Sequence, residues 1–333
     1  MENKTGKYFK YAIGEIVLVV IGILIAVSIN SKYNANQNEQ KFKNILTQIQ
    51  KELVIDINDA KRIFDVKMGK DSISRKIYYD TITLEQFKKN PYELIITNNY
   101  VSFTTQKGGY NRLIQNLENL PDKYSIILPF LNDLYVERLN DIDDYNESIK
   151  NTVMVENRQD RFINNPKHAD YLLGNYSNDE QISYFLNDPF RKNKTFLYMN
   201  DLENISGAAN DYKIEAIKLY KTIDSLLGTK TKGNNNVIRS IPLKDSIEPF
   251  LGTYKEIDNL YNMPDVTLSI ENEHMVIRNE RREFNLYWHK DNFYFRLSNN
   301  DVYKLYKNKN GQRIIKWSNA RYVTDFMNEK DIN

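Results

Sequence analysis

The chain has 333 residues, 41% hydrophobic and 27% charged, enough for about two globular domains and too apolar for a disordered chain. Its 46 basic and 44 acidic residues leave a net charge of +2. This balance argues against nucleic acid as a partner, because nucleic-acid-binding proteins carry a basic field. The absence of cysteine excludes disulfides, thiolate zinc sites and a cysteine nucleophile.

After a short tail of residues 1–10, a nearly uninterrupted apolar run extends from Tyr11 to Ile29. A helix that crosses a hydrocarbon core of ~30 Å needs about 20 mostly apolar residues. We therefore predict a transmembrane helix over residues 11–30 that contacts the lipid bilayer. Glu15 is the one charge in the run, and it lies near the start, where its carboxylate can reach the headgroups.

A cleaved signal peptide is the alternative interpretation of this segment. Lys4, Lys7 and Lys10 would form its basic region, residues 16–27 its apolar region, and Ala26-Val27-Ser28 its cleavage site. We favour the anchor because the whole apolar run is longer than that of a signal peptide and no A-x-A site follows it. The N-terminus of the mature protein, read by mass spectrometry, distinguishes the two.

The charges that flank the anchor predict its orientation. Three lysines precede the apolar run, and only Lys32 follows it closely. Because cytoplasmic flanks carry the excess of Lys and Arg, we expect a cytoplasmic N-terminus and a C-terminal body in the periplasm. Gly22 and Ala26 form a small-xxx-small pair, which predicts a homodimer through this helix. The alternative is that small residues are simply common in membrane helices.

One run carries a family resemblance: Lys10-Tyr11-Ala12-Ile13-Gly14-Glu15-Ile16-Val17-Leu18-Val19-Val20-Ile21-Gly22-Ile23-Leu24-Ile25-Ala26. It resembles the start of a family of single-pass membrane proteins from Bacteroidota, known mainly as a domain of unknown function. Members usually continue with an aliphatic-Gln-Ile-Asn-Asn-Trp-Asn stretch, whereas residues 27–34 here read VSINSKYN and lack the Trp. The resemblance implies an uncleaved anchor in the inner membrane of a bacterial envelope, and it implies no catalytic residue.

Three later stretches repeat apolar residues at intervals of three and four, the pattern of an amphipathic helix. The first, 37–69, would continue the anchor as a stalk. The second, 124–153, contains Pro129, which should kink the helix or split off its first turns. The third, 202–226, has the apolar spacing of a coiled-coil seam and should end at Gly228.

Long amphipathic helices cannot bury their apolar faces alone, so we expect an antiparallel helical bundle within residues 31–228. Shorter helices at 110–120 and 179–188 would close its side. The acidic group at 140–147 falls on the polar face of the second helix and lacks the spacing of a calcium loop, so we predict a solvated surface there.

The pattern changes after residues 229–237, which have the composition of a linker. In the following segment, 238–333, apolar residues alternate, with turn residues between the runs. The alternating runs lie at 266–270, 284–288, 293–297, 303–305, 314–317 and 322–323. We predict six to eight short antiparallel strands, closed as a small β-barrel or folded as a sandwich, and hence an α+β protein.

The start of this segment carries a second, looser resemblance. Pro249-Phe250-Leu251-Gly252-Thr253-Tyr254 precedes a Val-Thr-Leu strand, an Asn-centred turn and an aromatic hairpin. This order resembles the small β domain appended to some serine hydrolases of the penicillin-binding class. That domain is an accessory, and the Ser-x-x-Lys motif of those hydrolases is absent here. The resemblance therefore does not imply hydrolase activity.

Four residues of the β segment are candidates for ligand binding. Trp288 and Trp317 could stack on the sugar rings of a glycan, although aromatic residues more often fill a small β core. His274 and His289 would approach one another if their strands pair. No spacing signature accompanies them, so we predict no metal site.

The sequence contains neither G-x-S-x-G nor H-E-x-x-H, and no cofactor motif. We therefore expect a non-enzymatic envelope protein with a binding, sensing or scaffold role, whose partner is an unidentified envelope protein or glycan. An envelope hydrolase or its accessory subunit is one alternative, and a pocket that joins a histidine, a carboxylate and a hydroxyl would indicate it. A membrane-disrupting effector is the second, and toxicity on overexpression would indicate it.

Overall fold

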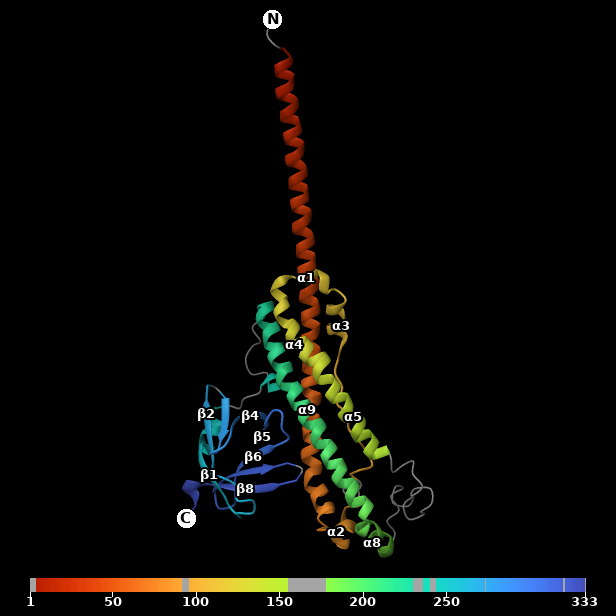
Figure 1. The fold of residues 1–333 in the computed structure, drawn as a ribbon, viewed down its shortest axis with the longest axis vertical. Helices are drawn as coiled ribbons and strands as arrows, with labels where there is room; N and C mark the ends of the chain where they lie inside the picture. The colour runs from red at the N-terminus through yellow and green to blue at the C-terminus, as the bar shows by residue number, and fades with distance from the viewer. Residues whose placement is uncertain are drawn as a thin grey trace.

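The computed structural model describes residues 4–91, 96–154, 178–229, 236–239, 244–272, 274–319 and 321–332, the side chains of 4–10, 12, 181, 185 and 236 excepted. It confirms the α+β architecture. A long N-terminal helix runs into a helical bundle, and a closed antiparallel β-barrel of eight strands lies beside that bundle (Figure 1).

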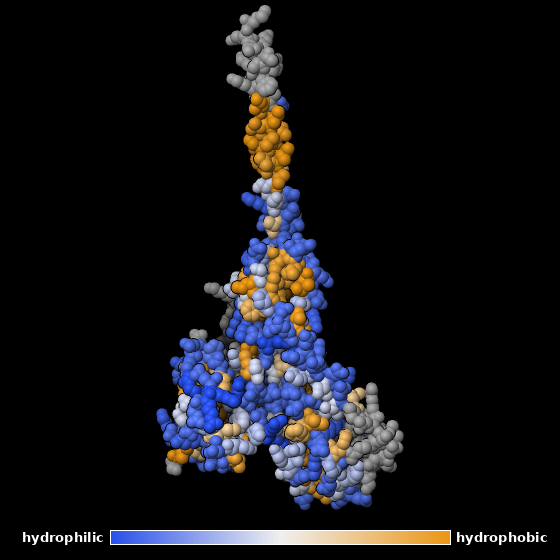
Figure 2. All heavy atoms as spheres, viewed as in Figure 1, coloured by the Kyte–Doolittle hydropathy of each residue, from blue (hydrophilic) through white to orange (hydrophobic). Residues whose placement is uncertain are grey.

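Helix α1 (Lys4–Tyr78) is one continuous helix of 75 residues. Its first half stands clear of the rest of the chain, and the apolar side chains there are exposed, as for Leu18 at 72% (Figures 1 and 2). This part is long and apolar enough to cross a membrane. From Phe42 onwards one face of α1 is buried, and the stripe predicted for residues 37–69 is confirmed at Phe42, Leu46, Ile49, Leu53, Ile57, Ala60 and Phe64.

The bundle forms around this buried stripe. Helix α9 (Pro189–Leu227) runs antiparallel to α1, and α5 (Arg138–Met154) packs beside α9 (Figure 1). Helix α9 starts earlier than its apolar pattern predicted, because the Asp188 side chain caps it and Pro189 fits the first turn. It ends where predicted, with Gly228 in the left-handed conformation at φ 64°.

The second predicted helix is divided into four parts, as the position of Pro129 suggested. They are η3 (Asp122–Ile127), α4 (Leu128–Asn132), the π-turn η4 (Asp133–Glu137) and α5. Pro129 lies in the first turn of α4, where its missing N–H costs no hydrogen bond. The acidic residues of the solvated surface predicted on α5, among them Asp141, Asp143 and Asp144, are exposed.

Shorter helices complete the bundle. The helix predicted at 110–120 is α3 (Gly108–Ile114) followed by η2 (Leu117–Asn119), and the one predicted at 179–188 is α8 (Asp179–Asn187). Helix α8 packs against α2 (Leu84–Lys89), so the two close the end of the bundle far from the apolar half of α1 (Figure 1).

Eight strands form a barrel in which each pairs antiparallel with the next and the last pairs with the first. They are β1 (Gly252–Glu256), β2 (Val266–Glu271), β3 (His274–Arg278), β4 (Glu283–Lys290), β5 (Phe293–Phe295), β6 (Val302–Lys307), β7 (Arg313–Ser318) and β8 (Val323–Asn328). Alternation alone did not reveal β1 or β3. Three consecutive residues of β3 are buried, and β1 buries only one, so neither shows a period of two.

The barrel is docked on the bundle and shares a core with it. In β5 only Tyr294 packs in the barrel interior, whereas Phe293 and Phe295 point outwards into the core of the bundle. The predicted linker falls mostly outside the described residues. Val237 and Ile238, at its end, lie in η6 (Asn236–Ile238) and pack against the bundle. The two parts therefore meet through a packed interface.

Candidate functional site

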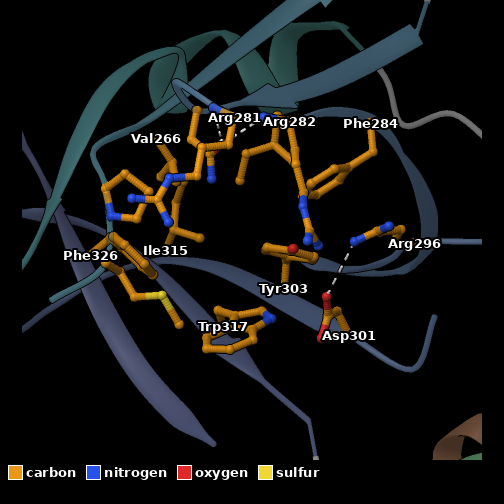
Figure 3. A pocket seen from close by; sticks show the side chains of 14 residues that line it. Val266, Arg281, Arg282, Phe284, Arg296, Asp301, Tyr303, Ile315, Trp317 and Phe326 are labelled. Carbon is orange, nitrogen blue, oxygen red and sulfur yellow. Dashed lines mark hydrogen bonds and ion pairs between the residues drawn. The ribbon is translucent and has the colours of Figure 1, made fainter. Parts of the chain in front are cut away.

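A pocket of about 250 Å³ opens at one end of the barrel (Figure 3). The opposite end is closed by the segment that precedes β1, where Ile247 of α10 (Lys244–Ile247) and Phe250 of η7 (Glu248–Phe250) are buried against the barrel interior. We call the open site the mouth pocket. Its lining residues are Met263, Pro264, Val266, Ile277, Asn279, Arg281, Arg282, Phe284, Arg296, Asp301, Tyr303, Ile315, Trp317 and Phe326.

The walls of the mouth pocket are apolar and aromatic because strand alternation turns every second side chain into the barrel. Phe284 and Tyr303 face each other with ring centroids 6.3 Å apart. Trp317 stands on the other side of the pocket from the β3–β4 turn (Figure 3). Burial raises the pKa of the Tyr303 hydroxyl, so this side chain stays neutral. Apolar walls with a few placed polar groups are typical of small-molecule sites.

The rim carries three arginines, two of which are fixed by a turn. In the β3–β4 turn the Asn279 side-chain oxygen accepts hydrogen bonds from the backbone N–H groups of Arg281 and Arg282, at 2.9 and 2.8 Å. Such an Asx turn holds the backbone and thereby aims both side chains. The third, Arg296, follows β5, and its guanidinium lies 4.3 Å from the centre of the Phe284 ring.

The charges at the rim are unbalanced. Asp301 is the one acidic residue among those that line the pocket, and it is already engaged, 3.8 Å from Arg296 and accepting from the Asn319 amide at 3.1 Å. Among the described residues, the Arg281 guanidinium forms an ion pair only with the exposed carboxylate of its neighbour Glu280, at 3.2 Å. The Arg282 guanidinium forms no hydrogen bond or ion pair with any described residue. The pocket therefore presents excess positive charge and free N–H donors.

The β5–β6 loop of the rim rests on the bundle. Asn300 donates to Asn204 of α9 at 3.2 Å, and its carbonyl accepts from Lys67 of α1 at 3.3 Å. The Ser298 backbone N–H donates to the Asp211 carboxylate at 3.1 Å. A Cβ at Gly207 would lie 2.0 Å from the Asn300 side-chain oxygen, so only glycine permits this close approach. One edge of the mouth pocket is thus held by α1 and α9.

The β7–β8 loop makes a further contact with α1. Arg75, near the end of that helix, donates a hydrogen bond to the backbone carbonyl of Asn319, and the Asn319 side chain in turn donates to Asp301 of the pocket. Asp71 fixes the Arg75 guanidinium through two hydrogen bonds, at 3.0 and 3.1 Å. A polar chain therefore connects α1 with the lining of the mouth pocket.

A second polar group, the junction cluster, lies where the outer wall of the barrel meets the bundle. It consists of Lys213 of α9, His289 and Lys290 of β4, and Asp65 of α1. The Lys213 amine lies 3.4 Å from His289 Nδ1, and His289 Nε2 lies 3.0 Å from Asp65. Lys290 also contacts Asp65, at 2.7 Å. The fully buried Lys213 side chain lies 4.3 Å from the centre of the Phe295 ring.

Burial determines the protonation of the junction cluster. Burial lowers the pKa of Lys213 well below its usual value, and burial, reinforced by the Lys213 charge, lowers the pKa of His289 to about 3. Burial alone would raise the pKa of Asp65, but hydrogen bonds from Lys290 and His289 outweigh it and lower that pKa. His289 is therefore a neutral imidazole that donates from Nε2 to an ionised carboxylate and accepts at Nδ1.

The junction cluster does not match the signature expected of a hydrolase. It pairs a histidine with a carboxylate, but neither His289 nor Asp65 lines the mouth pocket, and among the described residues no hydroxyl is a hydrogen-bond partner of the His289 side chain. We interpret the cluster as part of the packed interface.

The four candidate ligand-binding residues lie in three different places. Trp317 lines the mouth pocket. Trp288 packs against the barrel interior and donates from Nε1 to the Asp291 carbonyl at 2.9 Å. His274 is exposed at the start of β3, and His289 belongs to the junction cluster. The structure therefore brings Trp317 alone to the site, and in the described part of the chain no group of three or more His, Asp or Glu could hold a metal ion.

Sequence reasoning did not identify the arginines of the rim. The available signal was the Asn279-Glu280-Arg281-Arg282 turn, which places two adjacent cations after an Asx-turn residue. The anchor residues Glu15, Gly22 and Ala26 lie on the exposed half of α1, and nothing in the described chain lies within 4 Å of a Cβ placed at Gly22.

Comparison with known protein families found no family model that matches the chain, and comparisons with curated proteins and with solved structures found no match either. Both resemblances inferred from the sequence therefore stay predictions, and the functional argument rests on the mouth pocket itself.

Proposed function

We propose that this chain is a single-pass, membrane-anchored binding protein that holds a small molecule in the mouth pocket. The observation that carries the proposal is the open end of a closed barrel, where apolar walls meet three arginines, one of which, Arg282, has a guanidinium without a partner among the described residues. Binding accounts for this arrangement better than catalysis. Among the described residues, the lining contains no His, Lys, Ser, Thr or Glu, and its one carboxylate, Asp301, is engaged by Arg296 and Asn319.

The proposal places the protein in the inner membrane of a bacterial envelope, with its N-terminus in the cytoplasm and its body in the periplasm. The exposed apolar half of α1 and the lysines before it support this orientation. Because the chain lacks cysteine, a single introduced cysteine is the only thiol that a reagent can label. In intact spheroplasts, an impermeant maleimide should label Lys309→Cys but not Lys7→Cys. The reverse pattern would refute the proposed orientation, and a mature N-terminus near Ile29 would refute the anchor.

A sensing role follows from the rim contacts. The loops that border the mouth pocket are held by Lys67 and Arg75 of α1, the same helix that continues towards the membrane. A ligand that shifts these loops would therefore act on α1 directly. Spin labels at Tyr33→Cys and Lys309→Cys should report a changed distance distribution when the pocket is filled. An unchanged distribution would limit the role to binding.

The binding itself is tested on the full chain in lipid nanodiscs. A Trp288→Phe variant leaves Trp317 as the only tryptophan, so its fluorescence reports on the mouth pocket. Titration with a panel of small aromatic and aliphatic compounds, the neutral phenylbutanamide among them, should give saturable changes with some members. Val266→Phe narrows the pocket and should abolish them without a loss of fold by circular dichroism. No saturable binding, or binding unaffected by Val266→Phe, would overturn the proposal.

We also propose partners other than the lipid bilayer, namely a second copy of the chain and an envelope protein or glycan. A homodimer would use Gly22 and Ala26, where small side chains let two anchor helices approach. Cross-linking of a Val19→Cys variant in membranes should decrease when Gly22→Leu is added, and unchanged cross-linking would remove this dimer. An envelope protein or glycan would contact the exposed surface of the barrel or bundle, and a pull-down from membranes with and without the barrel would identify it.

A further inference from the structure

We infer that the ligand of the mouth pocket is a small amphiphilic anion, with an aromatic or branched apolar body and one carboxylate or similar anionic group. This inference rests on the proposed function and names its ligand class. The observation behind it is the polarity gradient of the pocket, which is apolar inside the barrel and cationic at the rim.

The apolar part of the ligand follows from the size and walls of the pocket. A volume of about 250 Å³ is below the ~300–1,000 Å³ of pockets that hold drug-sized molecules, so only a small body fits. Inside the barrel it would contact Val266, Ile277 and Ile315, all buried in the absence of a ligand. Tyr303 and Trp317 supply flat aromatic surfaces, which favour a planar body.

The anionic part follows from the donors at the rim. A guanidinium carries five N–H donors and no acceptor, so a ligand must bring acceptors to satisfy it. Figure 3 shows the Arg282 side chain extending into the pocket towards Tyr303 and Arg296. The Arg282 guanidinium has no partner among the described residues, and the Asp301 carboxylate is engaged by Arg296 and Asn319. A carboxylate at the Arg282 guanidinium would gain charge-assisted hydrogen bonds, in bidentate form where its two oxygens meet that guanidinium.

The same inventory disfavours a neutral sugar as the ligand. Sugar hydroxyls need acceptors as well as donors, and the amide and carboxylate oxygens of the lining are already engaged. The Asn279 side-chain oxygen accepts two backbone hydrogen bonds, and the Asp301 carboxylate is held by Arg296 and Asn319. A buried hydroxyl left without an acceptor would weaken binding.

Three probes with one body and different charges test the inference. Phenylbutanoate, phenylbutanamide and phenylbutylamine share their apolar part and differ in an anionic, neutral or cationic head. We expect phenylbutanoate to bind the full chain in nanodiscs about tenfold more tightly than the amide, a ratio that corresponds to about 1.4 kcal/mol, because a hydrogen bond to a charged group is stronger than one to a neutral group. The amine should bind most weakly. Added salt should weaken the binding of phenylbutanoate and leave the binding of phenylbutanamide unchanged.

Matched variants assign the effect to Arg282. Arg282→Gln should reduce the preference for phenylbutanoate over the amide to about twofold or less. Arg321→Gln removes the same charge from the β7–β8 loop, which borders the same end of the barrel, but Arg321 does not line the pocket and should leave the preference intact. Equal affinity for the anion and the amide would overturn the ligand class while leaving the binding function in place. An anion preference that Arg282→Gln and Arg321→Gln lower equally would also overturn it, because a general field would then be the cause.

Discussion

Two polar regions of the barrel, the junction cluster and the mouth pocket, both contain cationic side chains. They differ in what surrounds these side chains. At the junction cluster, Lys213 of the bundle and His289 of the barrel are buried, and the partners of their side chains are protein groups. At the mouth pocket, Arg281 and Arg282 are exposed beside a cavity, and Arg282 has no described partner. Buried polar groups must form hydrogen bonds with one another to avoid a desolvation penalty. Exposed polar groups are solvated by water and remain able to bind a ligand. Substitutions should therefore act on stability at the junction and on binding at the mouth.

The largest effect on stability is expected when the aromatic ring of Phe295, which packs beside the junction cluster, is removed. Phe295 is 2% exposed and packs against Phe64 and Lys213. Phe295→Ala should lower the free energy of unfolding by about 3–5 kcal/mol, because it leaves a cavity in a shared core. Phe284→Ala is the matched control, since this half-buried ring lines the mouth and should cost only about 1 kcal/mol. Chemical denaturation of the full chain measures both, and equal losses would contradict the comparison.

A second prediction concerns the pH dependence of stability, which we attribute to a buried carboxylate in the bundle interior. Asp56 is fully buried, accepts from Tyr212 at 2.9 Å and from the Gln106 N–H at 2.9 Å, and burial raises its pKa to about 7. Between about pH 4 and pH 7 the folded state keeps a proton that the unfolded chain has lost, so stability falls as pH rises through this range. Asp56→Asn should remove this dependence.

The measurement is the free energy of unfolding at pH 5 and pH 8. The native chain should lose about 2.5 kcal/mol more over this interval than Asp56→Asn, since one pKa unit corresponds to about 1.4 kcal/mol. Asp141→Asn makes the same change at an exposed carboxylate of α5, which is not among the groups that shift the pKa of Asp56, and should leave the pH dependence as it is. The idea fails if Asp56→Asn and the native chain respond to pH in parallel.

A smaller effect of opposite sign is expected at Lys213. Its amine is fully buried beside an aromatic ring and an imidazole, and burial keeps its pKa well below the usual value. Lys213→Met keeps the length of the side chain and removes the cost of neutralising the amine at pH 7, offset in part by the lost contact with His289. We expect a gain of about 1 kcal/mol in the free energy of unfolding. Lys218→Met, on the exposed side of α9, should be near neutral. A clear loss at Lys213 would show that the amine stabilises the interface.

The smallest effect on stability is expected at the rim. Arg282→Gln removes an exposed side chain without described partners, so the free energy of unfolding should change by less than about 0.5 kcal/mol. The same variant is expected to change ligand preference. A large loss of stability would mean that Arg282 stabilises the fold, as the buried residues of the junction cluster do.

Periodicity alone predicted much of the architecture. The buried stripe of α1, the end of α9 at Gly228 and the division of the second helix at Pro129 were all readable, because helix faces and helix stops are local properties. For the site, the aromatic Trp317 was a candidate and lines the pocket. The arginines were not candidates, since their approach depends on how separate turns meet at one end of a closed barrel.

The sequence by itself determined where the chain is apolar on all sides, where it is apolar on one face, and where its period changes from helix to strand, because neighbouring side chains carry these signals. Only the tertiary structure decided that Phe293 and Phe295 of β5 turn away from the barrel interior. It also decided that Lys213 is buried while Arg282 faces a cavity. Residues distant along the chain create these environments, and the burial that shifts a pKa or leaves a charge free to bind is a property of that packing.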